Sequence, residues 1–422
     1  MKSPLITHVE RTWVEVPLKP RHARHLTREN WDWTVFEVLR VETDAGLTGV
    51  GETMCYYTWG RVPQAQVERV LGRSPFEFLW EDSLGAGLQM ALWDLAGKAL
   101  GVPCYRLLGP KVRDWAPISW WSNDMSTVDW QQEIREALSL GYLSAKLKAR
   151  PWRDFVGQIE ALAALVPSDF RFDADYNGFL RNVGTALPHL RELERMAAVN
   201  LLESPLPQED VQGNVTLRSK VTRPIAMHYG SPPIETAIRE GVCDGFVIGG
   251  GACNLRRQGE LAAQFNKPFF LQLVGTGLTA AWMLHWGAVL THATWPAVTC
   301  HEIYQDDLLQ ERIPVRGGYA PVPEAPGLGV ELDEEAVARY RVDEGYNPAP
   351  PRNLYQVRWP SGARVTYPAG KLPVRPGLWD DFAAGNQPLF HRDVELEIVP
   401  DDGSPAWAEL EQRALQAPVR EA

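Results

Sequence analysis

Hydrophobic and polar residues alternate strictly near the start of the chain, which is typical of a half-buried β-strand. The alternation runs over residues 33–43, turns within 44–49 and resumes at 50–52. Apolar residues at helical spacing follow between Leu88 and Ala99, and this stretch closes with a glycine just before Pro103. The N-terminal part of the chain is therefore predicted to be an α+β domain.

From about residue 115 the pattern changes to short apolar stretches that alternate with helical stretches rich in Ala, Leu and Glu. The predicted strands are Ala116–Trp121, Leu143–Lys148, Phe170–Ala174, Asn200–Glu203, Pro224–Met227, Gly245–Ile248, Pro268–Gln272 and Ala297–Cys300. Their first residues lie 21 to 30 residues apart, the length of one strand-loop-helix unit. Eight such units in series predict an α/β fold that closes into a (β/α)8 barrel.

An open doubly wound sheet is the alternative arrangement of these units. Neither a G-x-G-x-x-G fingerprint nor a P-loop follows any of the predicted strands, which disfavours it. Beyond Cys300 the chain becomes rich in Pro and Gly, and strand-like alternation returns only after Arg352. The last eighty or so residues are thus predicted to form an appended β-rich segment, whose function the pattern does not reveal.

The composition is that of a soluble globular protein, with 45% hydrophobic and 23% charged residues and a formal net charge of -11. Because Lys and Arg are not concentrated anywhere, we expect no nucleic-acid partner. Charged residues such as Glu10 interrupt the opening segment, so we expect neither a signal peptide nor a membrane partner. The five cysteines lack metal-site spacing and suit reduced thiols in a cytoplasmic protein.

Chemistry in a parallel barrel belongs at the carboxyl ends of the strands. The second predicted strand ends with Lys146-Leu-Lys148, and period-two alternation sends both ammonium groups to the same side. The third ends with Asp173-Ala-Asp175, and the fourth ends with Glu203. Hard cations such as Mg²⁺ take oxygen ligands from a few carboxylates, so Asp173 and Glu203 are predicted to bind a magnesium ion.

Eight segments together resemble the enolase superfamily, in particular its mandelate racemase and muconate lactonizing enzyme branch. The resemblance covers roughly residues 5 to 340. The segments are Asp44-Ala-Gly-Leu-Thr-Gly-Val-Gly-Glu, Ala91-Leu-Trp-Asp-Leu-Ala-Gly-Lys, Gly101-Val-Pro, Leu107-Leu-Gly, Lys146-Leu-Lys148, Asp173-Ala-Asp, Glu203-Ser-Pro-Leu and Pro326-Gly-Leu-Gly-Val-Glu-Leu. Their order and spacing are specific as a set, although no one of them is decisive.

The resemblance implies an enolase-type barrel covered by an N-terminal capping domain, and it implies the domain boundaries. These are a capping domain over residues 1–114, a barrel over 115–315, a return to the capping domain over 316–345 and a C-terminal extension over 346–422. An early loop, around residues 17–31, is expected to close over the substrate. Mg²⁺, or Mn²⁺ in its place, is expected at the ends of the third to fifth strands, and the protein is expected to form a homo-oligomer.

In the chemistry that the resemblance implies, Lys148 removes the proton beside the carboxylate of a small-molecule substrate. Lys146 faces that carboxylate and helps to stabilise the enediolate. The physical requirement agrees, because such a proton is very weakly acidic and the dianionic intermediate needs a divalent metal and a cation in a water-poor pocket. A neutral Lys148 is needed for this role, and the neighbouring ammonium and the metal favour that form.

The sequence departs from the family pattern at three strand ends. The fifth strand carries His228 where a third acidic ligand is usual, so we expect His228 to act as a metal ligand or an acid/base group. The seventh carries Gln272 where the racemase-like group has a histidine, and the sixth reads Asp244-Gly-Phe-Val-Ile-Gly-Gly-Gly, without a base. At the eighth strand, Glu302 resembles the family's acidic residue and is expected to contact substrate.

A racemase or epimerase needs an acid or base on each face of the planar intermediate, whereas a dehydratase can work from one face. The missing second base therefore favours a lyase that dehydrates a hydroxy acid or an acid sugar, with an isomerase of the same superfamily as the alternative. A non-catalytic carboxylate-binding homologue with a decayed metal site is the alternative from another class.

Overall fold

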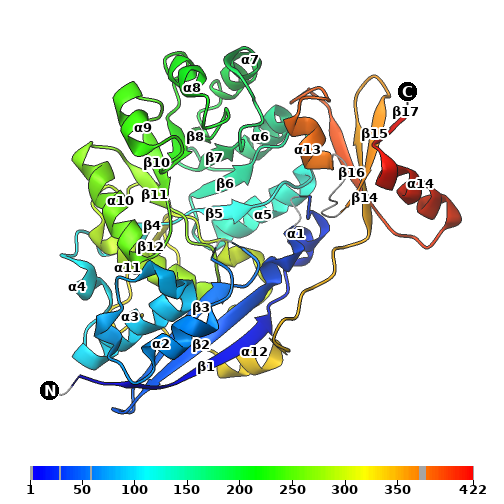
Figure 1. Cartoon of the computed structure of the whole chain (residues 1–422). Helices are drawn as coiled ribbons and strands as arrows, with labels where there is room; N and C mark the ends of the chain where they lie inside the picture. Colours follow the sequence, from blue (N-terminus) through cyan, green and yellow to red (C-terminus); the bar gives the residue numbers. More distant parts are fainter. Residues whose placement is uncertain (1–2, 28–29, 58, 370–376, 422) are drawn as a thin grey trace.

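The computed structural model describes residues 3–27, 30–57, 59–369 and 377–421. It has three parts, which are a barrel, an N-terminal sheet below it and a C-terminal segment at one side (Figure 1). No helix in these ranges has the length and apolar character that a membrane crossing requires.

The barrel is a parallel sheet with the strand order β11-β10-β9-β8-β7-β6-β5. Its strands are β5 (Trp120–Ser122), β6 (Ser144–Lys148), β7 (Arg171–Asp175), β8 (Val199–Glu203), β9 (Ile225–His228), β10 (Gly245–Ile248) and β11 (Phe269–Leu271). The helices that follow them are α5 (Thr127–Ser139), α6 (Phe155–Ala163), α7 (Val183–Leu193), α8 (Val211–Arg218), α9 (Ile234–Glu240), α10 (Ala252–Gln264) and α11 (Gly277–Val289). The predicted barrel-type fold is confirmed.

Two residues take the place of the eighth strand. Ala297 makes a parallel bridge to Ile118 at one edge of the sheet, and Val298 makes one to Gln272 at the other. The predicted strand Ala297–Cys300 is therefore shorter than expected, because Cys300 has a left-handed backbone (φ 60°) that ends it.

The first predicted strand is also divided. Its beginning forms β4 (Trp115–Pro117), which pairs with β12 (Tyr319–Pro321) outside the barrel, and only its end forms β5. Pro117 has no amide N–H to donate, which suits the point at which the chain changes partner. The segment 316–345 therefore first pairs with β4, through β12, and then returns to the N-terminal sheet.

The N-terminal sheet is antiparallel, with the order β13-β1-β2-β3. Its strands are β1 (Ile6–Glu15), β2 (Val35–Thr43), β3 (Thr48–Met54) and β13 (Arg341–Val342), and its helices are α1 (Pro20–Arg24), α2 (Gln64–Val70), α3 (Ala86–Leu100), α4 (Tyr105–Leu108) and α12 (Glu334–Arg339). A Cβ on Gly51 would collide with the main-chain oxygen of Gly87, so glycine allows α3 to lie directly on β3.

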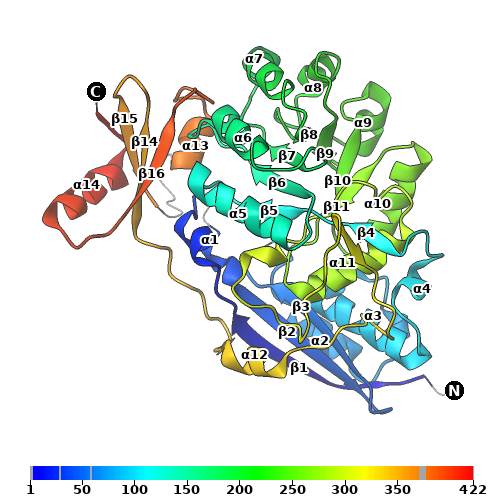
Figure 2. The ribbon, with the colours of Figure 1, turned by 180° about the vertical axis from the view of Figure 1, so that it is seen from behind.

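The C-terminal segment is a second antiparallel sheet with two helices. Its strands are β14 (Asn353–Arg358), β15 (Arg364–Pro368), β16 (Glu395–Pro400) and β17 (Val419–Glu421), and they lie in the sheet in the order β16-β14-β15-β17. Its helices are α13 (Leu378–Ala383) and α14 (Pro405–Gln416). The predicted β-rich extension is confirmed, while its helices were not expected. Seen from behind, α13 lies beside α5 and α6 of the barrel (Figure 2).

Two buried carboxylates join the N-terminal domain to the rest of the chain. Glu52, at the end of β3, accepts hydrogen bonds from the amide and hydroxyl groups of Thr276 and Thr279 at distances of 2.6 to 3.1 Å. These donors belong to the first turn of α11, where a helix leaves its amides unpaired. Asp94 of α3 accepts from the amides of Val50 and Leu328. The motifs at residues 44–52, 91–98 and 326–332 thus meet in space.

We predict that Glu52→Ala lowers the free energy of unfolding by roughly 2 to 3 kcal/mol, because four buried donors lose their acceptor. Urea unfolding of the variant and the wild type measures this loss. Glu42→Ala, which removes an exposed carboxylate of β2, is the control and should cost little. Equal losses in the two variants would contradict the assignment.

Candidate active site

Four buried charged groups meet at the carboxyl ends of β6, β7 and β8. The strand register places Lys148 beside Asp175 and Asp175 beside Glu203. Lys148 Nζ forms an ion pair with Asp175, and Lys146 Nζ lies 2.6 Å from Glu203 Oε2 and 3.4 Å from Asp175 Oδ2. All four are at most 5% exposed. The two predicted lysines therefore do share one side of the strand, where each is paired with a carboxylate.

These contacts shift the pKa values of the groups in opposite directions. Burial alone would raise the pKa of Asp175, but Lys148, Lys146 and Arg150 lower it well below its ordinary value. The pKa of Glu203 is set by a similar balance. Burial and the charge of Asp175 raise it, and Lys146 and His228 bring it below the ordinary value. Burial lowers the pKa of Lys146, and its two carboxylate partners more than reverse this. Asp175, Glu203 and Lys146 are therefore held in their ionised forms.

Asp173 lies next to this cluster but outside its ion pairs. Its carboxylate accepts a hydrogen bond of 3.0 Å from Asn200 Nδ2, and burial raises its pKa to about 6. Metal binding by Asp173 stays a prediction that this geometry disfavours. Asp175, at the same level of the sheet as Lys148 and Glu203, occupies the position that the prediction gave to Asp173.

The end of β9 brings His228 to the same place. His228 Nε2 lies 3.3 Å from Glu203 Oε1, and its side chain is 40% exposed. The two Glu203 oxygens are buried and accept no hydrogen bond of good geometry among the described residues, which leaves them to cations. Three or more His, Cys, Asp or Glu side chains do not come close enough to hold a metal anywhere in the described ranges.

This arrangement fits a divalent cation with two carboxylate ligands. Mg²⁺ is commonly held in this way, by one or two carboxylates with water or substrate oxygens in the remaining positions. Asp175 and Glu203 are the two residues that would hold it, with His228 on the exposed side of Glu203. A third carboxylate is thus not required by the coordination chemistry.

The opposite side of the barrel mouth carries Gln272 in place of a proton carrier. Gln272 Oε1 accepts a hydrogen bond of 2.7 Å from Lys146 Nζ. Asp244, the acid at the start of β10, is engaged elsewhere, with Arg218 and the amide of Ile225. The end of β10 contributes Gly249, Gly250 and Gly251, which line the cavity with main chain only.

Glu302 lies beside His301 and Tyr142. It follows the left-handed Cys300, in the short helix His301–Ile303, and its Oε1 lies 3.4 Å from His301 Nδ1. Burial, and after it the charge of Glu302, raises the pKa of Tyr142 well above its ordinary value. Its expected contact with substrate stays a prediction, and its neighbours indicate a structural role beside Tyr142.

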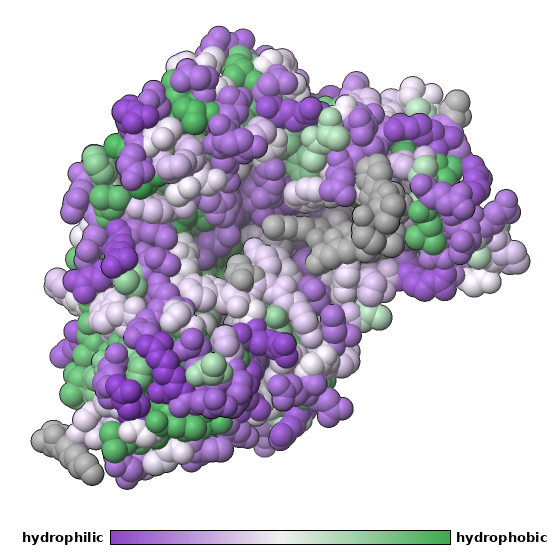
Figure 3. Space-filling view, viewed as in Figure 1, coloured by the Kyte–Doolittle hydropathy of each residue, from purple (hydrophilic) through white to green (hydrophobic). Residues whose placement is uncertain are grey.

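A cavity of about 320 Å³ separates the N-terminal domain from the barrel mouth. Its lining includes Tyr57 and Trp59 from the N-terminal side and His228, Tyr229 and Gln272 from the barrel. The space-filling view shows a hollow on the same face, between the barrel above and the N-terminal domain below (Figure 3). A ligand in this cavity lies between the two domains.

A row of aromatic rings connects the two domains beside Lys148. The ring centroids of Tyr57 and Trp33 lie 4.4 Å apart, and those of Trp33 and Trp121 lie 5.8 Å apart. Lys148 Nζ lies 5.9 Å from the Trp121 ring. The neighbouring Trp120 instead donates to Glu133 outside the mouth.

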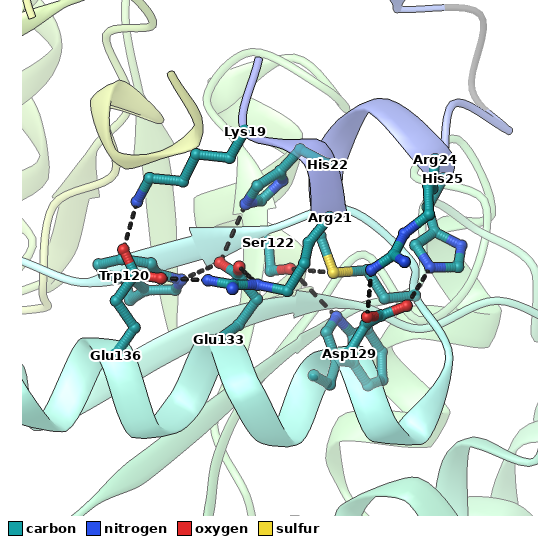
Figure 4. Close-up of polar contacts among 12 residues, drawn as sticks. Lys19, Arg21, His22, Arg24, His25, Trp120, Ser122, Asp129, Glu133 and Glu136 are labelled. Atoms are coloured by element: carbon teal, nitrogen blue, oxygen red, sulfur yellow. Dashed lines mark hydrogen bonds and ion pairs between the residues drawn. The ribbon is translucent and has the colours of Figure 1, made fainter. Parts of the chain in front are cut away.

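The early loop, which was expected to close over the substrate, docks through α1 on helix α5. Figure 4 shows basic and histidine side chains pointing from α1 toward the acidic face of α5. Buried His22 lies 2.9 Å from Glu133 Oε2 and 2.9 Å from Asn123 Oδ1, and Arg21 Nε donates to Glu133 Oε1 at 2.5 Å. Burial alone would raise the pKa of Glu133, but these partners lower it to about 2.

Three residues of the site were missed as functional candidates. Asp175, Asn177 and Arg150 follow the lysines and Asp173 at two-residue steps, in Lys-x-Lys-x-Arg and Asp-x-Asp-x-Asn. Period-two alternation places Asp175 on the same side of β7 as Asp173, which was the available signal. Arg150 and Asn177 lie beyond the ends of their strands, where alternation does not apply. Alternation also does not tell which of the two aspartates stands at the level of the mouth.

The model of the family "Enolase C-terminal domain-like" matches residues 129–336. Arabinonate dehydratase of Saccharolobus solfataricus is 24% identical over 71% of this chain and 89% of its own length. D-xylonate dehydratase of Haloferax volcanii is 27% identical over 74% of this chain and 86% of its own length. A solved mandelate racemase/muconate lactonizing family protein from Azoarcus sp. EbN1 is 26% identical, with a TM-score of 0.66, over 81% of this chain and 98% of that one.

We predict that Asp175→Asn abolishes stabilisation by divalent ions, whereas Asp173→Asn retains it. Thermal unfolding with and without millimolar Mg²⁺ or Mn²⁺ measures this. An ion at a hundred times its dissociation constant should stabilise the wild type by about 2.7 kcal/mol. If the Asp173 variant alone loses the effect, the original assignment is right. Absence of any effect in the wild type would reject a metal site here.

We also predict an acid-dependent loss of stability that belongs to Glu133. Its pKa is lowered from 4.5 to about 2 in the folded protein. The contribution is therefore complete above pH 4.5 and is lost as the pH falls toward 2. Between pH 5 and 3, urea unfolding should show a loss about 2 kcal/mol larger in the wild type than in Glu133→Gln. Glu136→Gln, on the same helix, should behave like the wild type.

Proposed function

We propose, from the premise that the chain belongs to the enolase superfamily, that it removes the α-proton of a hydroxylated carboxylic acid and eliminates water. The observation that carries the proposal is the one-sided distribution of proton carriers. Lys148 stands with Asp175 on one side of the mouth, and Gln272 faces it from β11. The amide side chain of Gln272 cannot act as an acid or a base near neutral pH. In this proposal, therefore, only the Lys148 side of the mouth carries a base for the α-proton.

Dehydration fits one-sided chemistry better than inversion does. In the proposed reaction, neutral Lys148 takes the α-proton, the C–H electron pair forms the enediolate, and the β-hydroxyl leaves as water. The resulting enol then becomes a 2-keto acid. The two relatives whose names denote dehydratases of sugar acids support this choice of reaction class. The substrate class is accordingly a sugar acid or a related hydroxy acid.

Each charged residue has a separate task in this proposal. Lys146, fixed between Glu203 and Gln272, faces the substrate carboxylate and balances the charge that develops there. His228 is the more exposed group beside Glu203 and is placed to give a proton to the departing hydroxyl, with Tyr229 next to it in the cavity lining. A magnesium or manganese ion on Asp175 and Glu203 would supply Lewis-acid stabilisation of the enediolate.

The remaining expectations stand as part of the same proposal. Homo-oligomeric assembly and a cytoplasmic location stay predictions. A racemase is the alternative within the superfamily, and it would require a second base where Gln272 stands, which an amide does not supply.

We predict that a screen of sugar acids and other hydroxy acids yields a substrate whose turnover forms a 2-keto acid. Lys148→Met should reduce turnover by at least about a thousandfold while the fold is kept, because a flexible side chain of similar length replaces only the amine. Gln272→Ala is the matched control at the other side of the mouth and should be much milder.

The same reaction in deuterium oxide separates the alternatives. A dehydratase with one base leaves the recovered substrate with its original configuration at the α-carbon. Rapid inversion with uptake of deuterium would show a racemase, and His301 or Tyr229 would be the first candidate for the missed base. If no acid in the screen turns over but carboxylates bind, the protein is a carboxylate-binding homologue and the proposal is wrong.

A further inference from the structure

Arg150 is a third buried cation beside the two lysines, and its side chain is 1% exposed. Its guanidinium donates to main-chain oxygens at the ends of two strands, 2.9 Å to Ala149 O and 3.3 Å to Asp175 O. Its Nη2 donates to Asn177 Oδ1 at 3.0 Å. The guanidinium group of one arginine therefore links the loop after β6 to the loop after β7, and these loops directly follow Lys148 and Asp175.

Asn177 passes this constraint to the reacting groups. Its amide N–H donates to Asp175 Oδ1 at 3.1 Å, and its Oδ1 also lies 3.5 Å from Lys148 Nζ. Its backbone is left-handed (φ 47°), a conformation that asparagine tolerates better than most residues. Because Arg150 holds the Asn177 side chain from the other side, it fixes the direction from which Asn177 meets both Asp175 and Lys148.

The far side of Arg150 is covered by the C-terminal segment. The guanidinium carbon lies 4.8 Å from the Trp379 ring centroid and 5.7 Å from that of Phe179. Trp379, in α13, also packs against Phe179 at 4.6 Å and Trp152 at 6.1 Å, which belong to the two barrel loops that Arg150 joins. An aromatic face beside a guanidinium both attracts its charge and excludes water from it.

This contact comes from a part of the chain that lies beyond the family match. The match ends at residue 336, and the solved relative is covered over 98% of its own length by only 81% of this chain. The C-terminal segment is thus additional to the barrel and its cap, yet it touches the support of the active-site residues.

We propose that Arg150 is a positioning residue and that Trp379 of the C-terminal segment holds it in place, so that the appended segment is a working part of the active site. The consequence for catalysis rests on the proposed function, while the positioning itself does not. Because small displacements of reacting groups are costly, loosening Arg150 should slow turnover more than it weakens substrate binding.

A purely structural role of the segment is the reading to be excluded, and the chain offers a matched control. Trp407 lies in the same segment, is 5% exposed and also carries an arginine on its ring, with Arg352 at 5.1 Å. Its buried neighbours are Leu354, Ala414 and Val419, all within the segment. Trp407→Ala therefore perturbs the segment without removing the contact to Arg150.

The first measurement needs no substrate. Hydrogen exchange of the full-length protein should show the amides around residues 175–178 exchanging on the order of tenfold faster in Trp379→Ala than in the wild type. Trp379→Phe keeps an aromatic ring and should restore most of the protection. Trp407→Ala should leave these amides unchanged. Equal exchange in the two alanine variants overturns the proposal.

The second measurement uses the acid identified by the screen. Trp379→Ala and Arg150→Lys should each lower kcat by about tenfold or more with KM changed by less than about twofold, since lysine keeps the charge but not the fork. Trp379→Phe should recover most of kcat, and Trp407→Ala should retain the wild-type value. A loss of kcat shared by both alanine variants, or one that follows only the loss of folded protein, overturns the proposal. Full turnover by Lys148→Met would instead refute the proposed function and leave the exchange result standing.

Discussion

The site depends on the mutual neutralisation of buried charges at the ends of three adjacent strands. Lys146 and Lys148 would each be costly to bury alone, and so would Asp175 and Glu203. Their pairing compensates this cost only while all four stay in register, since removal of one partner leaves an unpaired buried charge. The barrel supplies that register, because neighbouring parallel strands present their ends at one level. The N-terminal domain, joined to α11 through Glu52, forms the other wall of the cavity at the mouth.

Much of the fold was predictable because hydrophobic periodicity reports burial directly. Strands that are buried on both faces appear in the sequence as short apolar runs, and seven of the eight runs overlap a strand of the barrel sheet. Strand ends that depend on the backbone conformation of a single residue were harder to predict. An example is the end of the eighth run at Cys300, whose backbone is left-handed. The helix α14 carried a local signal, with Ser404 as a capping residue before Pro405, which strand alternation around it obscured.

The site was predictable as a set of strand ends but not as a set of contacts. Alternation shows that Asp173 and Asp175 share a side, whereas their heights relative to Lys148 and Glu203 depend on the stagger between strands. That stagger includes an irregularity between Phe172 and Asp173, which no local pattern reveals. The contact between Arg150 and the Trp379 ring could not be predicted from local patterns, because these residues lie more than two hundred positions apart in the sequence.

The proposed anionic substrate would have to bind to an acidic chain. The net charge of the chain is -11, which by itself would repel a carboxylate. Locally, the ends of β6 and β7 bring Lys146, Lys148 and Arg150 together, and the two lysines form ion pairs with Asp175 and Glu203. These charged groups are buried, so salt screens them less than it screens charges at the surface. In the proposed reaction, the substrate carboxylate therefore meets Lys146 in a place where the attraction between the two charges is screened least.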